Sequence, residues 1–225
     1  MAILAVLASA IAAASGSFNG DISTISAKAQ AAAILEQANE VKLGVDRLIA
    51  KGCTDTQISF ENPIVSGYVN SNAPSDKSCH VFDINGGGII YKDISRDATD
   101  KNFTSESEYA RVIFSGNERV MQVGTYLGEE LMMFYPYIKL DVCLELNKIL
   151  NVKTSNDSPP VLNAYDVSIS KYDGYYSYNA VFGFGVGQAP EMIGMMSGCW
   201  NQMTNPISIG LKPNSYHFYQ VLVVR

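Results

Sequence analysis

Four cysteines have the most definite chemistry in this chain: Cys53, Cys79, Cys143 and Cys199. None of them forms a CxxC pair, and this spacing argues against a zinc site. An even number of cysteines behind an N-terminal segment of the exported type predicts two disulfides, the alternative being buried thiols in a cytosolic protein. Several pairings are possible. We favour Cys53–Cys79 with Cys143–Cys199, because the first two bracket one compact, turn-rich segment.

Other residues that could do chemistry lack the partners that a catalytic site needs. His80 and His217 lie in strand-like alternation and belong to no HExxH motif. Ser197 lacks the spacing of a GxSxG nucleophile elbow. Gly86-Gly87-Gly88 precedes the strand-like Ile89-Ile-Tyr91 rather than a helix, so it predicts a turn and not a phosphate site. We therefore expect no enzyme, no catalytic residue, no cofactor and no bound metal.

Two surface features could carry modification or recognition. Asn102 and Asn156 begin the sequons Asn-Phe-Thr and Asn-Asp-Ser in expected loops, where glycosylation is sterically possible. Four tyrosines lie close together in the chain and could contact sugar or a neighbouring subunit: Tyr172, Tyr175, Tyr176 and Tyr178. The half-buried face of a strand would explain these tyrosines equally well.

The composition of the chain argues against some classes of function. The chain has 225 residues and a net charge of −6, with no basic run. Nucleic-acid binding needs a cationic footprint, so we expect no nucleic-acid partner. The 13 tyrosines and nine phenylalanines favour a strand-rich globular part.

The first 20 residues, MAILAVLASAIAAASGSFNG, contain no charged side chain. A signal peptide would carry cations before its apolar region, and none is present. A membrane helix needs about 20 apolar residues, and Met1–Phe18 would just span a bilayer core. The third interpretation is a helix buried among copies of itself, because small residues let helix backbones approach closely. Gly16 and Gly20 interrupt the stretch and predict a melted or kinked section.

Residues 21–51 show a helical period, with polar residues between apolar ones. The expected apolar face is Ile22, Ile25, Ala29, Ala32, Leu35 or Ala38, Val41, Val45, Leu48 and Ile49. Gly44 is the one weak position, and Gly52 marks the expected end of the helix. This helix should pack its apolar face on the globular part.

The remainder of the chain carries mainly strand and turn signals. Residues 110–114 and 119–123 predict a hairpin, 129–137 another strand, 137–152 a helix with Cys143, and 176–186 and 216–224 further strands. The predicted fold is α+β: a long N-terminal α-helix packed on an antiparallel β-sheet globular head with two disulfides. The expected domains are a helical stalk at 1–51, apolar over 1–20 and amphipathic over 21–51, and a strand-rich head at 52–225.

This layout resembles the type IV pilins and pseudopilins. Met1–Ser15 matches their apolar rod, Gly16–Gly20 the weak section and Asp21–Lys51 the amphipathic half. The segment Gly52–Phe82 and the closing HFYQVLVVR also resemble a group of uncharacterised bacterial pilin-like proteins. The chain departs from the family in having Ala5 where most members carry a glutamate.

The resemblance implies a structural subunit of an extracellular filament on the bacterial surface. Its partners would be identical subunits, the inner membrane before assembly, and the pilus assembly machinery. The implied polymerisation core comprises Met1, Ala2, Ile3, Leu4, Ala5, Val6, Leu7, Ala8, Ile11 and Ala12. A minor pseudopilin of a secretion system is one alternative, and an N-terminally anchored envelope protein that binds glycans is another.

Overall fold

The computed structural model describes residues 22–125, 128–155, 157–163, 170–178, 180–183, 188–203 and 211–225. A long helix, α2 (Ile22–Ala50), comes first. A loop-rich segment with the short 3-10 helices η1 (Asp55–Gln57), η2 (Arg96–Ala98) and η3 (Lys101–Phe103) follows. The remaining elements are β1 (Ile113–Val120), β2 (Glu130–Ile138), α3 (Leu140–Ile149), β3 (Val161–Leu162), β4 (Ala180–Phe182), η4 (Pro190–Met192), β5 (Ser197–Gln202) and β6 (Ser215–Val223).

The six strands form one mixed sheet in the order β3-β5-β6-β2-β1-β4. The four inner strands pair antiparallel, but β4 runs parallel to β1, and β3 runs parallel to β5. The predicted antiparallel sheet is therefore wrong. Parallel neighbours need long crossover connections, and turn signals in a sequence reveal only the short antiparallel ones.

The hairpin predicted over 110–123 is also wrong. The strand β1 continues through the expected turn at Ser115–Glu118, where the pairing with β2 shifts register as in a β-bulge. A Cβ atom on Gly116 would lie 2.8 Å from the ring of Tyr172. Gly116 thus allows this ring to approach the strand, and it does not form a turn.

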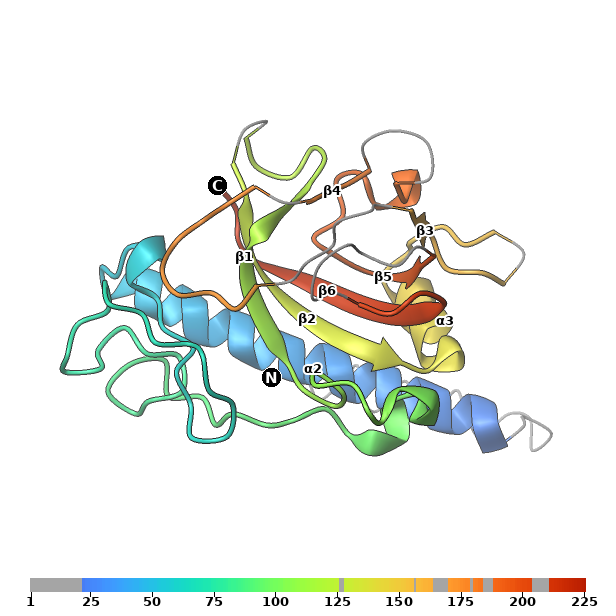
Figure 1. The fold of residues 1–225 in the computed structure, drawn as a ribbon, viewed down its shortest axis with the longest axis horizontal. Coiled ribbons are helices and arrows are strands. Elements are labelled where there is room, and N and C mark those ends of the chain that lie inside the picture. The colour runs from blue at the N-terminus through green and yellow to red at the C-terminus, as the bar shows by residue number, and fades with distance from the viewer. Residues whose placement is uncertain are drawn as a thin grey trace, which may run out of the picture.

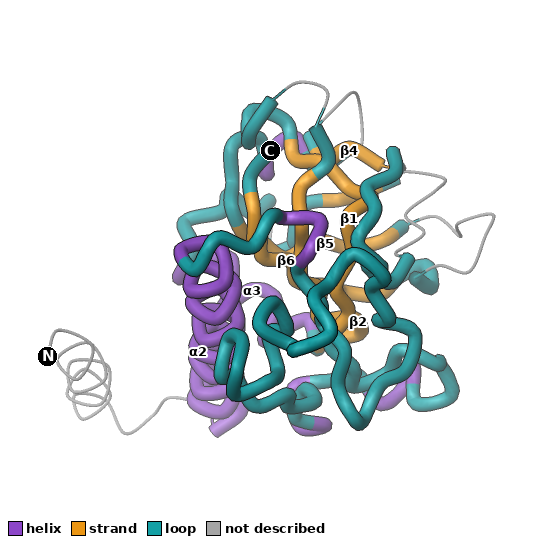
Figure 2. Tube along the Cα trace, turned by 90° about the vertical axis from the view of Figure 1, so that its left-hand side faces the viewer, coloured by secondary structure: helices purple, strands orange, loops and turns teal. Residues whose placement is uncertain are grey.

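Both faces of the sheet are covered. On one face, α2 packs against α3 and β6, and its apolar residues share a core with Met133 and Tyr135 of β2 and Phe218 of β6 (Figures 1 and 2). On the other face, Trp200, Phe182 and Tyr219 form a second core. Strand β2 is buried along its whole length as a result.

The helix predicted over 21–51 is present as α2, but its buried face differs from the expected one. The buried residues are Ala27, Ala31, Ile34, Ala38, Val41, Val45 and Leu48. In the second half of the helix the expected face agrees with these except for Ile49, which is exposed. In the first half, Ile25, Ala29 and Ala32 are exposed instead. Alanines occupy both sides of that half, so periodicity could not show which side meets the head.

In the loop-rich segment after α2, the strand-like Ile89-Ile-Tyr91 belongs to no strand. Between Cys53 and Ile94 the structure has turns and one isolated bridge, which joins Ser59 to His80. Side-chain packing orders this segment, because Phe60 stacks on Phe114 of β1 with ring centroids 4.0 Å apart. Conversely, residues 197–202, for which the sequence predicted no strand, form the inner strand β5.

Candidate functional site

The outer face of α2 combines apolar and small residues with exposure to solvent. We call Ile25, Ala29, Ala32 and Leu43 the outer stripe of α2; they recur four, three and eleven residues apart on the side opposite the buried face. Ile25 is 55% exposed and Leu43 is 53% exposed. The helix lies at one edge of the described part of the chain, with the sheet to one side of it (Figure 2). The head covers the other side of the helix, and the exposed Glu36 interrupts the outer stripe between Ala32 and Leu43.

The charges of α2 balance within the helix. Its basic residues are Lys28, Lys42 and Arg47, and its acidic residues are Glu36, Glu40 and Asp46. Lys42 pairs with Asp46 one turn on at 2.5 Å, and Glu40 pairs with Lys92 of the following segment at 3.4 Å. Such exposed pairs contribute little to stability. They leave the helix without the net charge that would repel a second copy.

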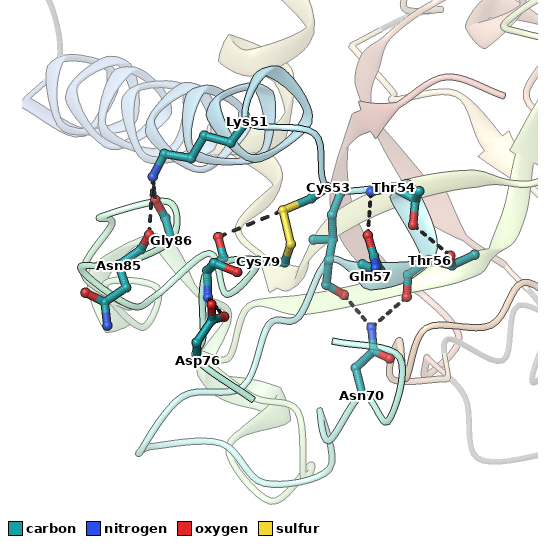
Figure 3. The surroundings of a disulfide bond; sticks show 12 residues. Lys51, Cys53, Thr54, Thr56, Gln57, Asn70, Asp76, Cys79, Asn85 and Gly86 are labelled. Atoms are coloured by element: carbon teal, nitrogen blue, oxygen red, sulfur yellow. Dashed lines mark hydrogen bonds between the residues drawn. A yellow bond between two sulfur atoms is a disulfide. The ribbon is translucent and has the colours of Figure 1, made fainter. Parts of the chain in front are cut away.

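The first disulfide fastens the segment after α2 to the end of that helix. It joins Cys53 to Cys79, which is one half of the pairing favoured from the sequence (Figure 3). Beside it, Nζ of Lys51 donates to the carbonyl oxygen of Gly86 at 2.7 Å, and Arg47 donates to that of Gly87 at 3.1 Å. Gly86 and Gly87 thus direct their carbonyl oxygens toward the cationic side chains of Lys51 and Arg47. This arrangement fixes the loop on α2 and does not cradle a phosphate.

Two of these glycines are required by close backbone contact. A Cβ atom on Gly86 would lie 2.0 Å from the carbonyl oxygen of His80, and one on Gly87 would lie 2.6 Å from that of Val81. The amide N–H of Gly87 donates to the His80 carbonyl at 2.9 Å. The three glycines therefore form the tight turn that the sequence predicted.

The second disulfide joins Cys143 of α3 to Cys199 of β5, completing the favoured pairing. The side chain of Asn147 lies next to it and is fully buried. Its amide donates to the Cys199 carbonyl at 2.8 Å, and its oxygen accepts the Cys199 N–H at 2.8 Å. Sequence reasoning missed Asn147. Its position four residues after Cys143, one turn along the predicted helix, was the available signal.

The two histidines are held in structural environments. Burial lowers the pKa of His217 to about 3, so its imidazole is neutral. Its Nδ1 accepts the N–H of Tyr137 at 3.2 Å, which leaves the proton on Nε2 to donate to Oγ of Ser215 at 2.6 Å. Ser215 in turn donates to the carbonyl of Lys212. Because His217 and Ser215 are completely buried, no substrate reaches this pair.

A pair of buried carboxyl groups was not foreseen from the sequence. Glu118 of β1 and Glu130 of β2 are cross-strand partners, and both side chains are fully buried. Oε2 of Glu130 accepts the N–H of Val120 at 3.0 Å. Burial raises the pKa of Glu130 to about 7, against the lowering effect of that hydrogen bond. The sequence placed Glu130 inside a predicted strand but Glu118 in the expected turn, so it did not indicate that the two would be partners.

The remaining predicted sites are only partly covered by the structure. All ten residues of the expected polymerisation core, together with Gly16 and Gly20, lie outside the described residues, and so does Asn156. Asn102 lies exposed within η3, and its glycosylation stays a prediction. Of the four clustered tyrosines, Tyr172 is buried, whereas Tyr175 and Tyr178 are exposed.

Two further observations apply only to the described residues. No group of three histidine, cysteine, aspartate or glutamate side chains gathers there as a metal site would require. None of the helices described there has both the length and the apolar character needed to cross a membrane.

The two disulfides are typical of an extracellular or secreted protein, because the cytosol keeps thiols reduced. Comparison of the chain with protein-family models, with curated proteins and with solved structures finds no match.

Proposed function

We propose that this protein is the structural subunit of an extracellular filament, and that it polymerises through its N-terminal helix. The outer stripe of α2 carries the proposal. Ile25, Ala29 and Ala32 continue the apolar, alanine-rich composition of residues 1–20 along the side of α2 that the head leaves uncovered. Small residues on a bare helix face allow another helix to approach closely.

A second copy of the same chain is the partner that suits the outer stripe of α2. The helix carries equal numbers of acidic and basic residues, so identical helices would meet without net repulsion. Contacts between different faces of identical subunits give a filament rather than a ring when the rotation between neighbours does not close. The head, cross-linked twice, would then form the outer surface.

The test introduces a cation into the outer stripe. In Ala32→Lys, the exposed position keeps the fold intact, while a charge within the helix-to-helix contact should prevent assembly. Ala50→Lys is the matched control, because Ala50 is also an exposed alanine of α2 but lies at its far end. Material sheared from cells that make the full chain is imaged by electron microscopy, and thermal unfolding checks the fold.

We expect uniform filaments from the original chain and from Ala50→Lys, and none from Ala32→Lys. Undiminished filaments from Ala32→Lys would overturn the proposed contact. If the original chain occurs only within mixed assemblies of other subunits, the minor pseudopilin is the correct alternative.

A further inference from the structure

An open pocket of about 710 Å³ lies on the head, away from the outer stripe of α2. Several separate segments meet there, and the side chains that matter are Thr56, Thr125, Glu129, Tyr175, Tyr176 and Arg225. This volume falls within the range of roughly 300–1,000 Å³ that small-molecule sites occupy. The pocket is wide enough to admit a ligand from solvent without rearrangement of the core.

One wall of the pocket is held in place by a chain of contacts. Nε of Arg225 pairs with Oδ2 of Asp55 at 2.9 Å, and its guanidinium carbon lies 3.8 Å from the centre of the Tyr176 ring. Tyr176 meets the edge of Tyr172 with centroids 5.3 Å apart, and the Tyr172 hydroxyl donates to the Asp55 carbonyl at 2.8 Å. A wall fixed before binding lowers the entropy lost when a ligand is ordered.

The rest of the pocket offers groups that are open to solvent. The ring of Tyr175 is 62% exposed. Thr125 is exposed and Glu129 is half-buried. An exposed aromatic ring provides a flat apolar surface, and hydroxyl and carboxylate groups supply hydrogen-bond acceptors beside it. A sugar ring has matching parts, because it presents C–H groups on its face and hydroxyl groups around its rim.

The charges in the pocket select among ligands. Arg225 is already paired with Asp55, and Glu129 adds a negative charge to the opening. Phosphates and acidic sugars would meet this carboxylate without a free cation to balance it. A purely apolar ligand would have to desolvate the charged groups of the lining. Neutral, hydroxyl-rich ligands face neither penalty.

We propose that this pocket binds neutral carbohydrate, with a sugar ring stacked on Tyr175 and its hydroxyl groups bonded to Glu129 and Thr125. The site is independent of assembly through α2. It gives the head a recognition role in addition to its structural one.

The test applies the full chain to an array of neutral and sialylated oligosaccharides, and then measures dissociation constants for the bound ones by calorimetry. Tyr175→Ala should weaken binding at least about tenfold, whereas Tyr175→Phe should retain it, because only the ring is needed. Tyr178→Ala is the matched control: Tyr178 is 66% exposed and lies near Tyr175 in the chain, but it does not line the pocket.

Binding to neutral oligosaccharides that Tyr175→Ala loses and Tyr178→Ala keeps would support the proposal. No binding to any oligosaccharide, equal binding by Tyr175→Ala, or a preference for the sialylated ones would overturn it. Ala32→Lys should bind the same sugars as the original chain, so a failure of the filament proposal and a failure of this one are separable.

Discussion

Glu130 shows how one buried side chain can make the stability of a secreted head depend on pH. Its carboxyl group lies opposite Glu118 inside the sheet, where an ionised form loses its hydration. The loss of hydration raises the pKa of Glu130 to about 7, because the N–H of Val120, the backbone of Glu130 and the charge of Arg119 compensate only part of it. At neutral pH this residue is therefore close to the midpoint of its titration in the folded protein.

The direction of this pH effect follows from the pKa of Glu130 in the unfolded chain and in the folded protein. The unfolded chain releases this proton near the ordinary pKa of 4.5, while the folded protein holds it up to a pKa of about 7. The free energy of unfolding should therefore fall as the pH rises through this interval, and stay low above it. We predict that Glu130→Gln is more stable than the original protein at pH 8, by up to about 3 kcal/mol.

The measurement is urea unfolding of both proteins between pH 4 and pH 8. The stability difference should shrink toward pH 4, where the carboxyl group is protonated in both states. Glu36→Gln serves as the control for the loss of one carboxylate, because Glu36 is an exposed residue of α2. Parallel curves for Glu130→Gln and the original protein would contradict the assignment.

At the scale of elements, Gly44 explains an irregularity that the sequence shows but does not account for. Glycine within a helix costs about 1 kcal/mol relative to alanine. The structure places Gly44 where a Cβ atom would lie 2.6 Å from Cγ1 of Ile89, in the segment that folds over α2. Gly44 therefore lowers the stability of the helix, but it allows the segment around Ile89 to pack closely against it.

We predict that Gly44→Ala destabilises the protein by about 1 kcal/mol, because the gain in helix propensity is smaller than the cost of overpacking against Ile89. In an Ile89→Ala background the same change should instead stabilise it, by about 1 kcal/mol. Urea unfolding of the four proteins of this cycle measures the coupling between the two positions. An equal effect of Gly44→Ala in both backgrounds would show that the contact is unimportant.

Some helices and strands could be predicted from the sequence, and other features of the fold could not. The helix α3 and the strands β2 and β6 follow from local periodicity, and their positions agree closely with those expected. The sequence argument concerned Cys53 and Cys79, and the pairing of Cys143 with Cys199 followed because these two cysteines remained. The outer stripe of α2 could not be told from the buried face, because alanines occur on both sides. The parallel neighbours of β1 and β5 depend on long connections, which leave no local signal.

For the whole molecule, the two disulfides should differ in their contribution to stability. Cys53–Cys79 spans 26 residues and Cys143–Cys199 spans 56. Loop-closure entropy gives about 3.5 and about 4 kcal/mol for these separations. The second bridge is also completely buried, and it joins α3 to the sheet.

We therefore predict that Cys143→Ala with Cys199→Ala lowers the free energy of unfolding more than Cys53→Ala with Cys79→Ala does. Both pairs should lose roughly 2–5 kcal/mol. Chemical unfolding of the two double variants, monitored by circular dichroism, gives the comparison. A larger loss from the Cys53–Cys79 pair would mean that the segment around Gly86 stabilises the head more than the α3 contact does.

The position of β6 also has a consequence for the order in which the molecule folds. This strand lies between β5 and β2, so it is an inner member of the sheet although it comes after the other strands of the described residues. A chain that emerges with its N-terminus first from a ribosome or an export channel exposes β2 long before its inner neighbour arrives. Closure of the sheet is thereby postponed until residue 223 is free, and pairings over such long sequence separations form slowly.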